Sequence, residues 1–125
     1  MDADVKAALA RDGTIDITTV GARSGLARRS EIWFLHLDGR TFITGTPGPR
    51  NWYSNLLAHD LFTFHLREST TADLSARAVP ILDEATRRWV FSQPHRWNDW
   101  YLGEAPFDEL VASAPLVEVL FHESR

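Results

Sequence analysis

The chain has 125 residues, no cysteine, and a formal net charge of −4 from 13 basic and 17 acidic side chains. A single domain over residues 1–125 can bury roughly two-thirds of the surface of its unfolded form, so a core needs no disulfide bonds. The lack of cysteine excludes thiolate catalysis, zinc–thiolate sites and iron–sulfur clusters, and the acidic balance argues against nucleic acid as a partner.

Metal binding and membrane insertion are not expected either. The five histidines are scattered along the chain and none lies in a pattern such as H-E-x-x-H, so we predict no metal site. Residues 1–5 carry acidic side chains instead of the basic start of a signal peptide, and no apolar run approaches the ~18 residues of a membrane span. We therefore expect a cytoplasmic protein.

Apolar and alternating segments predict an α+β fold. Strands are expected at residues 14–19, 31–37, 40–44, 61–66, 73–82 and 116–121. Short helices are expected at residues 4–11, 51–59, 83–93 and 95–101, with one more helical turn at 107–112. The pair Asp38-Gly39 is a strong hairpin signal, so the second and third strands should pair antiparallel. About six antiparallel strands with two to four short helices bury their faces best as a split β-barrel.

A basic turn containing two glycines follows the first predicted strand. Gly21 and Gly25 flank Arg23, and Arg28 and Arg29 follow closely. Glycine permits a positive φ and the close approach of a ligand, and guanidinium groups suit phosphate. Two interpretations fit this turn: a cradle for a phosphate group, or an exposed hairpin loop whose arginines are solvated.

Residues 45–59 predict a second anion-binding element. A loop rich in glycine and proline, residues 45–50, leads into a helix that starts near Asn51. The start of a helix directs backbone N–H groups and a positive dipole outward, so it would complement the arginine turn if the two face each other. Trp52 and Leu56 share one stripe of this helix and also suit a plug for the barrel. Both interpretations can hold, because packing and ligand contact use different faces.

Three aromatic residues recur at helical spacing near the end of the chain. Trp97, Trp100 and Tyr101 lie at i, i+3 and i+4 and therefore share one helical face. This stripe is either part of the core or one wall of a ligand site, since large rings with a polar handle also suit a planar ligand.

Together these segments resemble a known family, the deazaflavin-dependent nitroreductases and quinone reductases, relatives of the flavin-binding split barrels that include pyridoxamine phosphate oxidase. The resemblance covers residues 17–121 and is carried by residues 18–25, 33–34, 48–56 and 115–119. The family pattern in the first loop is T-x-G-R-K-S-G-x-P-R. Ala22 and Arg23 stand where the family has arginine and lysine, and Ala27 and Glu31 replace prolines. Losing one charge-assisted contact costs about 1.5 to 3 kcal/mol of phosphate binding, which Arg29 would offset.

The resemblance implies an oxidoreductase that uses reduced deazaflavin, coenzyme F-420, with FMN as the alternative. Its acceptor would be apolar and electron-poor, such as a quinone or a nitroaromatic. The residues implied to bind the cofactor are Arg23, Ser24, Gly25, Arg28, Arg29, Trp33, Thr44, Thr46, Gly48, Arg50, Asn51, Trp52 and Asn55. Trp97, Trp100 and Tyr101 would shape the acceptor pocket. The proton would come from water, Tyr53 or Tyr101, and Tyr101 is favoured because it lies in the aromatic cluster. Split-barrel flavoproteins often pair at the cofactor site, so the resemblance also favours a homodimer.

Two other classes of protein stay open at this stage. One is a non-enzymatic carrier of the same fold, which would bind a flavin, haem or another small ligand and hold its acid groups with the arginines. The other is a binder of single-stranded nucleic acid in which Trp52 or Trp97 stacks on bases, although no extended basic groove is evident. The sequence contains no G-x-S-x-G motif and no carboxylate pair spaced for hydrolysis. This favours a cofactor that performs the chemistry itself.

Overall fold

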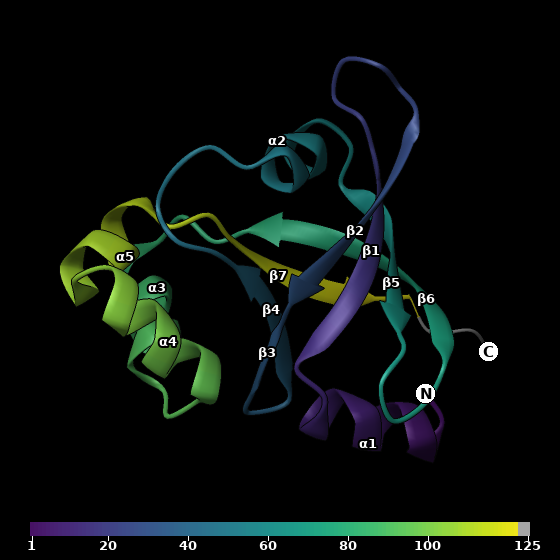
Figure 1. Ribbon diagram of the computed structural model, residues 1–125, viewed down its shortest axis with the longest axis horizontal. Helices are drawn as coiled ribbons and strands as arrows, with labels where there is room; N and C mark the ends of the chain where they lie inside the picture. Colours follow the sequence, from purple (N-terminus) through teal and green to yellow (C-terminus); the bar gives the residue numbers. More distant parts are fainter. Residues whose placement is uncertain (123–125) are drawn as a thin grey trace.

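The computed structural model describes residues 1–122, and in this part of the chain five helices surround one seven-stranded antiparallel sheet (Figure 1). The strands are β1 (Thr14–Val20), β2 (Ala27–Trp33), β3 (Leu35–Leu37), β4 (Arg40–Thr44), β5 (Leu61–Leu66), β6 (Ala72–Pro80) and β7 (Leu116–Phe121). The helices are α1 (Ala3–Arg11), α2 (Asn51–Ala58), α3 (Glu84–Ser92), α4 (Arg96–Glu104) and α5 (Phe107–Ser113). The sheet order is β2-β1-β5-β6-β7-β4-β3 and the sheet curls into a half-barrel. The predicted split-barrel architecture is confirmed.

One predicted strand was wrong. Residues 31–37 are not a single strand paired with residues 40–44, because β2 begins at Ala27 and pairs with β1, whereas β3 pairs with β4. Phe34 separates β2 from β3, and its N–H donates to the carbonyl oxygen of Gly13 at 3.0 Å. At this point the chain crosses from one edge of the curled sheet to the other. The nearly continuous apolar run conceals the break, since alternation cannot be read where both faces are buried.

The inner face of the sheet forms the main core. Ile17, Phe34, Ile43 and Phe64 are at most 1% exposed there, and Leu56 of α2 packs among them. Figure 1 shows α1 and α2 at opposite ends of the barrel. Helix α2 therefore closes this end of the barrel with its buried side, and its other side borders the space outside the barrel.

A second core joins α3, α4 and α5 to the outer face of the sheet. Leu35, Phe42 and Leu116 from β3, β4 and β7 pack with Tyr101 of α4 and Leu110 of α5. The three helices lie together on one side of the barrel (Figure 1). This packing brings the aromatic stripe of α4 next to the junction of β2 and β3.

A buried arginine ties α3 to the C-terminal end of α5. Arg87 is 7% exposed, and its guanidinium donates to the carbonyl oxygens of Ile81, Leu110, Val111 and Ala114. The last carbonyl groups of a helix lack partners within the helix and carry partial negative charge. Burial lowers the pKa of Arg87, and the four carbonyl dipoles compensate its charge. Arg87 therefore acts as a C-terminal cap supplied by a neighbouring helix.

We predict that Arg87→Met lowers the free energy of unfolding by about 3–5 kcal/mol, since it leaves several buried carbonyl groups unpaired. Urea unfolding measures this loss. The neighbouring Arg88→Met is the matched control, because Arg88 is exposed and pairs with Glu84 and Asp108 at the surface, where an ion pair is worth about 0.2–1 kcal/mol. Equal losses for the two variants would contradict the capping role.

Candidate functional site

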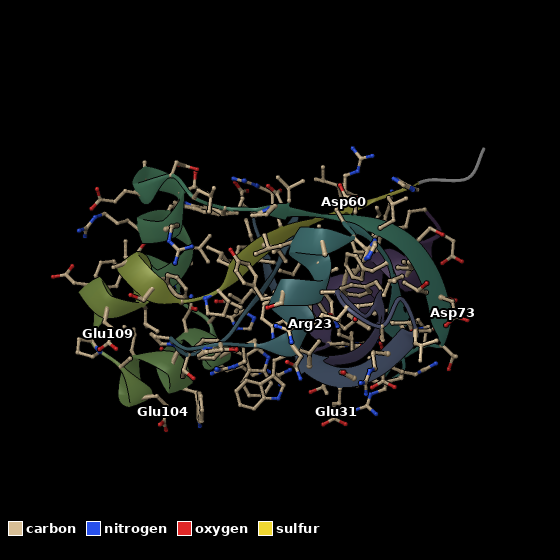
Figure 2. The ribbon with its side chains drawn as sticks, turned by 90° about the horizontal axis from the view of Figure 1, so that it is seen from above. Arg23, Glu31, Asp60, Asp73, Glu104 and Glu109 are labelled. Carbon is tan, nitrogen blue, oxygen red and sulfur yellow. The ribbon has the colours of Figure 1, made fainter. Side chains whose placement is uncertain are left out.

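A cleft lies between the β1–β2 hairpin and the start of α2. Its first part, the arginine end, has a volume of about 580 Å³. The lining residues are Gly21, Ala22, Arg23, Ser24, Arg28, Ser30, Asn51, Trp52, Ser54 and Asn55. Figure 2 shows Arg23 beside α2. The structure thus brings together the arginine turn and the helix start that the sequence predicted as two anion-binding elements.

The turn that carries Arg23 has a fixed backbone shape. Gly25 has a φ of +69°, which favours glycine, and its N–H donates to the carbonyl oxygen of Gly21 at 2.9 Å. A Cβ on Gly21 would lie 2.3 Å from the Oγ of Ser24, so a side chain at that position would displace Ser24 from its place in the turn. Gly25 shapes the turn without lining the cleft, whereas Ser24 lines it.

Asn55 joins α2 to the turn. Its Oδ1 accepts a hydrogen bond from the N–H of Ala22 at 2.9 Å, and its Nδ2 donates to the Oγ1 of Thr19 at 3.2 Å. Asn55 is 9% exposed, so both bonds form in a site largely shielded from water. The resemblance implies that Asn55 contacts the cofactor ring. In the structure Asn55 lines the cleft, and its polar atoms hold the arginine turn in place.

The two adjacent arginines of β2 face in opposite directions. Arg28 lines the cleft together with Ser30, as the two-residue period of a strand requires. Arg29 faces the other side of the sheet, where its Nε donates to the Oδ2 of Asp16 at 3.0 Å. Arg29 therefore lies outside the cleft, where it cannot take the place of the cation missing at Ala22.

The second part of the cleft, the aromatic end, has a volume of about 270 Å³ and shares Trp52 with the arginine end. Its lining residues are Glu31, Ile32, Trp33, Thr44, Gly45, Thr46, Arg50, Trp52, Trp100 and Tyr101. The two parts share Trp52 as a lining residue and therefore lie next to each other.

The free edge of β2 borders the aromatic end. In the described chain β2 pairs with β1 alone. The N–H of Gly21 donates to the carbonyl oxygen of Leu26, and the N–H of Phe34 donates to that of Gly13, which shows which residue pairs of β1 and β2 are hydrogen-bonded. Because hydrogen-bonded and non-hydrogen-bonded pairs alternate in an antiparallel ladder, the backbone groups of Glu31 point away from β1. The backbone groups of Trp33 also point away from β1. The cleft therefore has N–H donors and C=O acceptors along one side.

Tryptophan stacking builds the back of the aromatic end. The rings of Trp33 and Trp97 stack with centroids 3.8 Å apart and an interplanar angle of 7°, and Trp100 meets Trp33 edge-on at 5.1 Å. The indole N–H of Trp97 donates to the carbonyl oxygen of Gly13 at 3.1 Å. Trp97 thus supports Trp33 from behind, while Trp100, 46% exposed, lines the cleft. The aromatic stripe of α4 therefore contributes to the second core through Trp97 and lines the cleft through Trp100.

Tyr101 is buried at the base of this wall. Its hydroxyl donates to the carbonyl oxygen of Thr44 at 3.3 Å, and burial raises the pKa of Tyr101 to about 12. A raised pKa keeps the phenol protonated and makes it a weak acid at neutral pH. In this arrangement Tyr101 holds the end of β4 in position.

Arg50 stabilises the loop that closes the aromatic end. Its Nη2 donates to the carbonyl oxygen and Oγ1 of Thr46 at 3.0 and 2.6 Å, and its Nη1 donates to the carbonyl oxygen of Pro49 at 2.9 Å. Gly48 has a φ of +128° and lies under this guanidinium. Gly48 shapes the loop from outside the cleft, and Arg50 borders the cleft while bracing the loop.

Sequence reasoning missed several lining residues. Ala22, Ser30, Ile32 and Ser54 line the cleft, and two of them could have been found, since Ser30 and Ile32 follow Arg28 at the strand period of two. Over residues 1–122 no group of three or more histidine, aspartate or glutamate side chains could hold a metal ion. In the same part of the chain no helix is long and apolar enough to cross a membrane.

Solved structures share this fold at low sequence identity. A pyridoxamine 5'-phosphate oxidase-like protein from Listeria innocua matches with a TM-score of 0.69 and 14% identity over 95% of this chain and 91% of that one. A structure described as an F420 reductase matches with a TM-score of 0.60 and 18% identity, over 94% and 93%. The haem storage protein HutZ from Vibrio cholerae matches with a TM-score of 0.56 and 13% identity, over 96% and 89%. These likenesses establish the fold alone.

The sequence itself identifies the family. No curated protein matches the chain significantly, but the model of the F420H(2)-dependent quinone reductase family matches residues 2–102. That span includes the arginine turn, the free edge of β2, the start of α2 and the aromatic stripe of α4. The chain belongs to the F420H(2)-dependent quinone reductase family.

Proposed function

We propose that this protein is a reductase that binds reduced coenzyme F-420 in the cleft beside β2 and reduces an apolar, electron-poor acceptor such as a quinone or nitroaromatic. The observation that carries the proposal is the division of one cleft into a cationic end and an aromatic end, which meet at Trp52. A deazaflavin nucleotide has the same division, with a phosphate-bearing tail and a planar ring system.

The arginine end suits the phosphate. Arg23 and Arg28 supply guanidinium groups, which form strong charge-assisted bonds to phosphate. Helix α2 begins at the same place, and its first turn contains no acidic residue that would neutralise the positive end of the helix dipole. Backbone and side chains therefore attract the same anion.

The aromatic end suits the ring. Trp52 and Trp100 offer flat apolar surfaces, and the free backbone groups of Glu31 and Trp33 offer donors and acceptors to the polar edge of a heterocycle. The bound deazaflavin supplies the hydride. The protein's own part is to hold the ring within about 3 to 3.5 Å of the acceptor and to keep water away.

The acceptor would enter where Trp100 meets solvent. An apolar, flat molecule gains from burial against that ring. Because the pKa of Tyr101 is raised to about 12 and its proton is held by Thr44, we assign proton delivery to solvent and a positioning role to Tyr101.

The carrier alternative receives less support. Among residues 1–122, no histidine, cysteine or methionine lines either part of the cleft, so the described lining offers none of the common axial ligands of haem. FMN remains the alternative cofactor, since it shares the phosphate and the planar ring. The cytoplasmic location and the homodimer expected from sequence stay predictions.

Titration of the purified protein with coenzyme F-420 and with FMN tests the proposal. We expect F-420 to bind with a Kd in the micromolar range or below, and more tightly than FMN, as measured by quenching of tryptophan fluorescence. Failure of both cofactors to bind below high micromolar concentrations would refute the proposed function.

The phosphate contact is tested separately with Arg23→Ala. We predict a loss of about 1.5 to 3 kcal/mol in binding of the phosphorylated cofactor, roughly 10- to 150-fold in Kd, and little change for the phosphate-free ring compound. Arg29→Ala is the geometric control, since Arg29 faces away from the cleft, and it should leave both affinities nearly unchanged. Equal losses for the two ligands in Arg23→Ala would reduce Arg23 to a role in folding.

The role of Asn55 is tested with Asn55→Leu. This change leaves the N–H of Ala22 without its partner and should cost about 1 to 3 kcal/mol of stability. Hydrogen exchange without cofactor should show the amide of Ala22 exchanging much faster, while that of Ile17 in the core of β1 changes only with global stability. Unchanged protection at Ala22 would show that the turn holds its shape without Asn55.

A further inference from the structure

A chain of hydrogen bonds crosses the outer face of the sheet, apart from the cleft. The Oγ1 of Thr18 lies 2.7 Å from the Nε2 of His65, and the Nδ1 of His65 lies 2.7 Å from the Oδ1 of Asp73. These residues come from the adjacent strands β1, β5 and β6. His65 and Asp73 are direct cross-strand partners, and Thr18 is a diagonal neighbour of His65. The register of the sheet therefore assembles a hydroxyl, an imidazole and a carboxylate in a row.

The carboxylate determines the tautomer of the imidazole. The hydrogen bond from His65 and the nearby charge of Arg29 lower the pKa of Asp73, so Asp73 is ionised and can only accept. Nδ1 of His65 must then carry a proton. In the neutral imidazole Nε2 is an acceptor, and the hydroxyl of Thr18 must donate to it. A hydroxyl bound to a base that a third group orients is the arrangement of an activated nucleophile.

The surroundings of Thr18 leave room for a small substrate. A hollow of about 350 Å³ adjoins it, and its lining includes Thr18, Thr63, Ser75 and His122. His65 is 6% exposed, which holds its ring in place. Arg29 lies directly opposite Thr18 in the register of β1 and β2, and its guanidinium pairs with Asp16.

We propose that Thr18, His65 and Asp73 form a second reactive site that takes the acyl group of small esters. The Oγ1 of Thr18 bonds to the ester carbonyl carbon while its proton passes to Nε2 of His65. The bond from carbon to the leaving oxygen then breaks, and that oxygen takes the proton from His65. Water, deprotonated by His65, releases the acid from Thr18.

This site is separable from the reductase cleft. Thr18 and Thr19 are consecutive in β1, yet Thr19 faces inward to Asn55 and Thr18 faces outward to His65. Figure 2 shows Arg23 beside α2 and Asp73 at the outer edge of the sheet. The proposal can therefore be tested in the protein without any cofactor, and its failure would leave the proposed reductase untouched.

The test uses 4-nitrophenyl acetate with the full-length protein. We expect nitrophenolate release with an acetyl group on Thr18, located by peptide mass spectrometry of acid-quenched samples. Thr18→Val should abolish that modification and lower the rate by about 10²-fold, the lower range for general-base catalysis. Asp73→Asn should lower it less, through a misoriented imidazole. Thr18→Ser, which keeps the hydroxyl, should retain acylation at this position.

The chain supplies its own control in a second threonine–histidine pair. The Nδ1 of His36 lies 3.1 Å from the Oγ1 of Thr41, with no carboxylate bonded to that imidazole among the described residues. His36→Gln should therefore leave the rate unchanged, and Thr41 should stay unmodified. An unchanged rate in Thr18→Val, or acetyl groups found only on lysine or the N-terminus, would overturn the proposal. If Thr18→Val does not fold, loss of Thr18 acylation in His65→Gln supports the proposal and its persistence refutes it.

Discussion

The two-residue period of β1 and β2 is the constraint on which the rest of the structure depends. It turns Arg28 toward α2 and Arg29 toward Asp16, although the two are adjacent in sequence. The same period divides Thr19, bonded to Asn55, from Thr18, bonded to His65. Because each step along a strand reverses the direction of the side chain, one hairpin supplies residues to two different surfaces of the barrel.

The cleft itself arises because, within the described part of the chain, β2 pairs with a strand on one side only. A helix start, a braced loop and a tryptophan wall occupy the space where a further strand would pair. An unpaired strand edge is a liability in most proteins, since it invites other chains to pair with it. Here α2 and the loop at Thr46 stand beside the edge, and its backbone groups are available to a planar ligand.

Contacts among the protein's own residues hold the walls of the cleft in place. Asn55 binds the turn, Arg50 braces the loop, and Trp97 supports Trp33 from behind. Orientation of a ring and its acceptor depends on such support, because small displacements cost much of the rate in hydride transfer. Residues to which the resemblance assigns ligand contact thus also hold the walls of the cleft in place.

Sequence alone determined the α+β class, most strand positions, the arginine turn and the helix start at Asn51, because these are local patterns of alternation, glycine and charge. It could not find the break at Phe34, since an apolar run buried on both faces shows no alternation. It also could not separate the roles of Arg28 and Arg29, or bring Thr18, His65 and Asp73 together. Those depend on the register between strands far apart in the chain, which only the folded sheet decides.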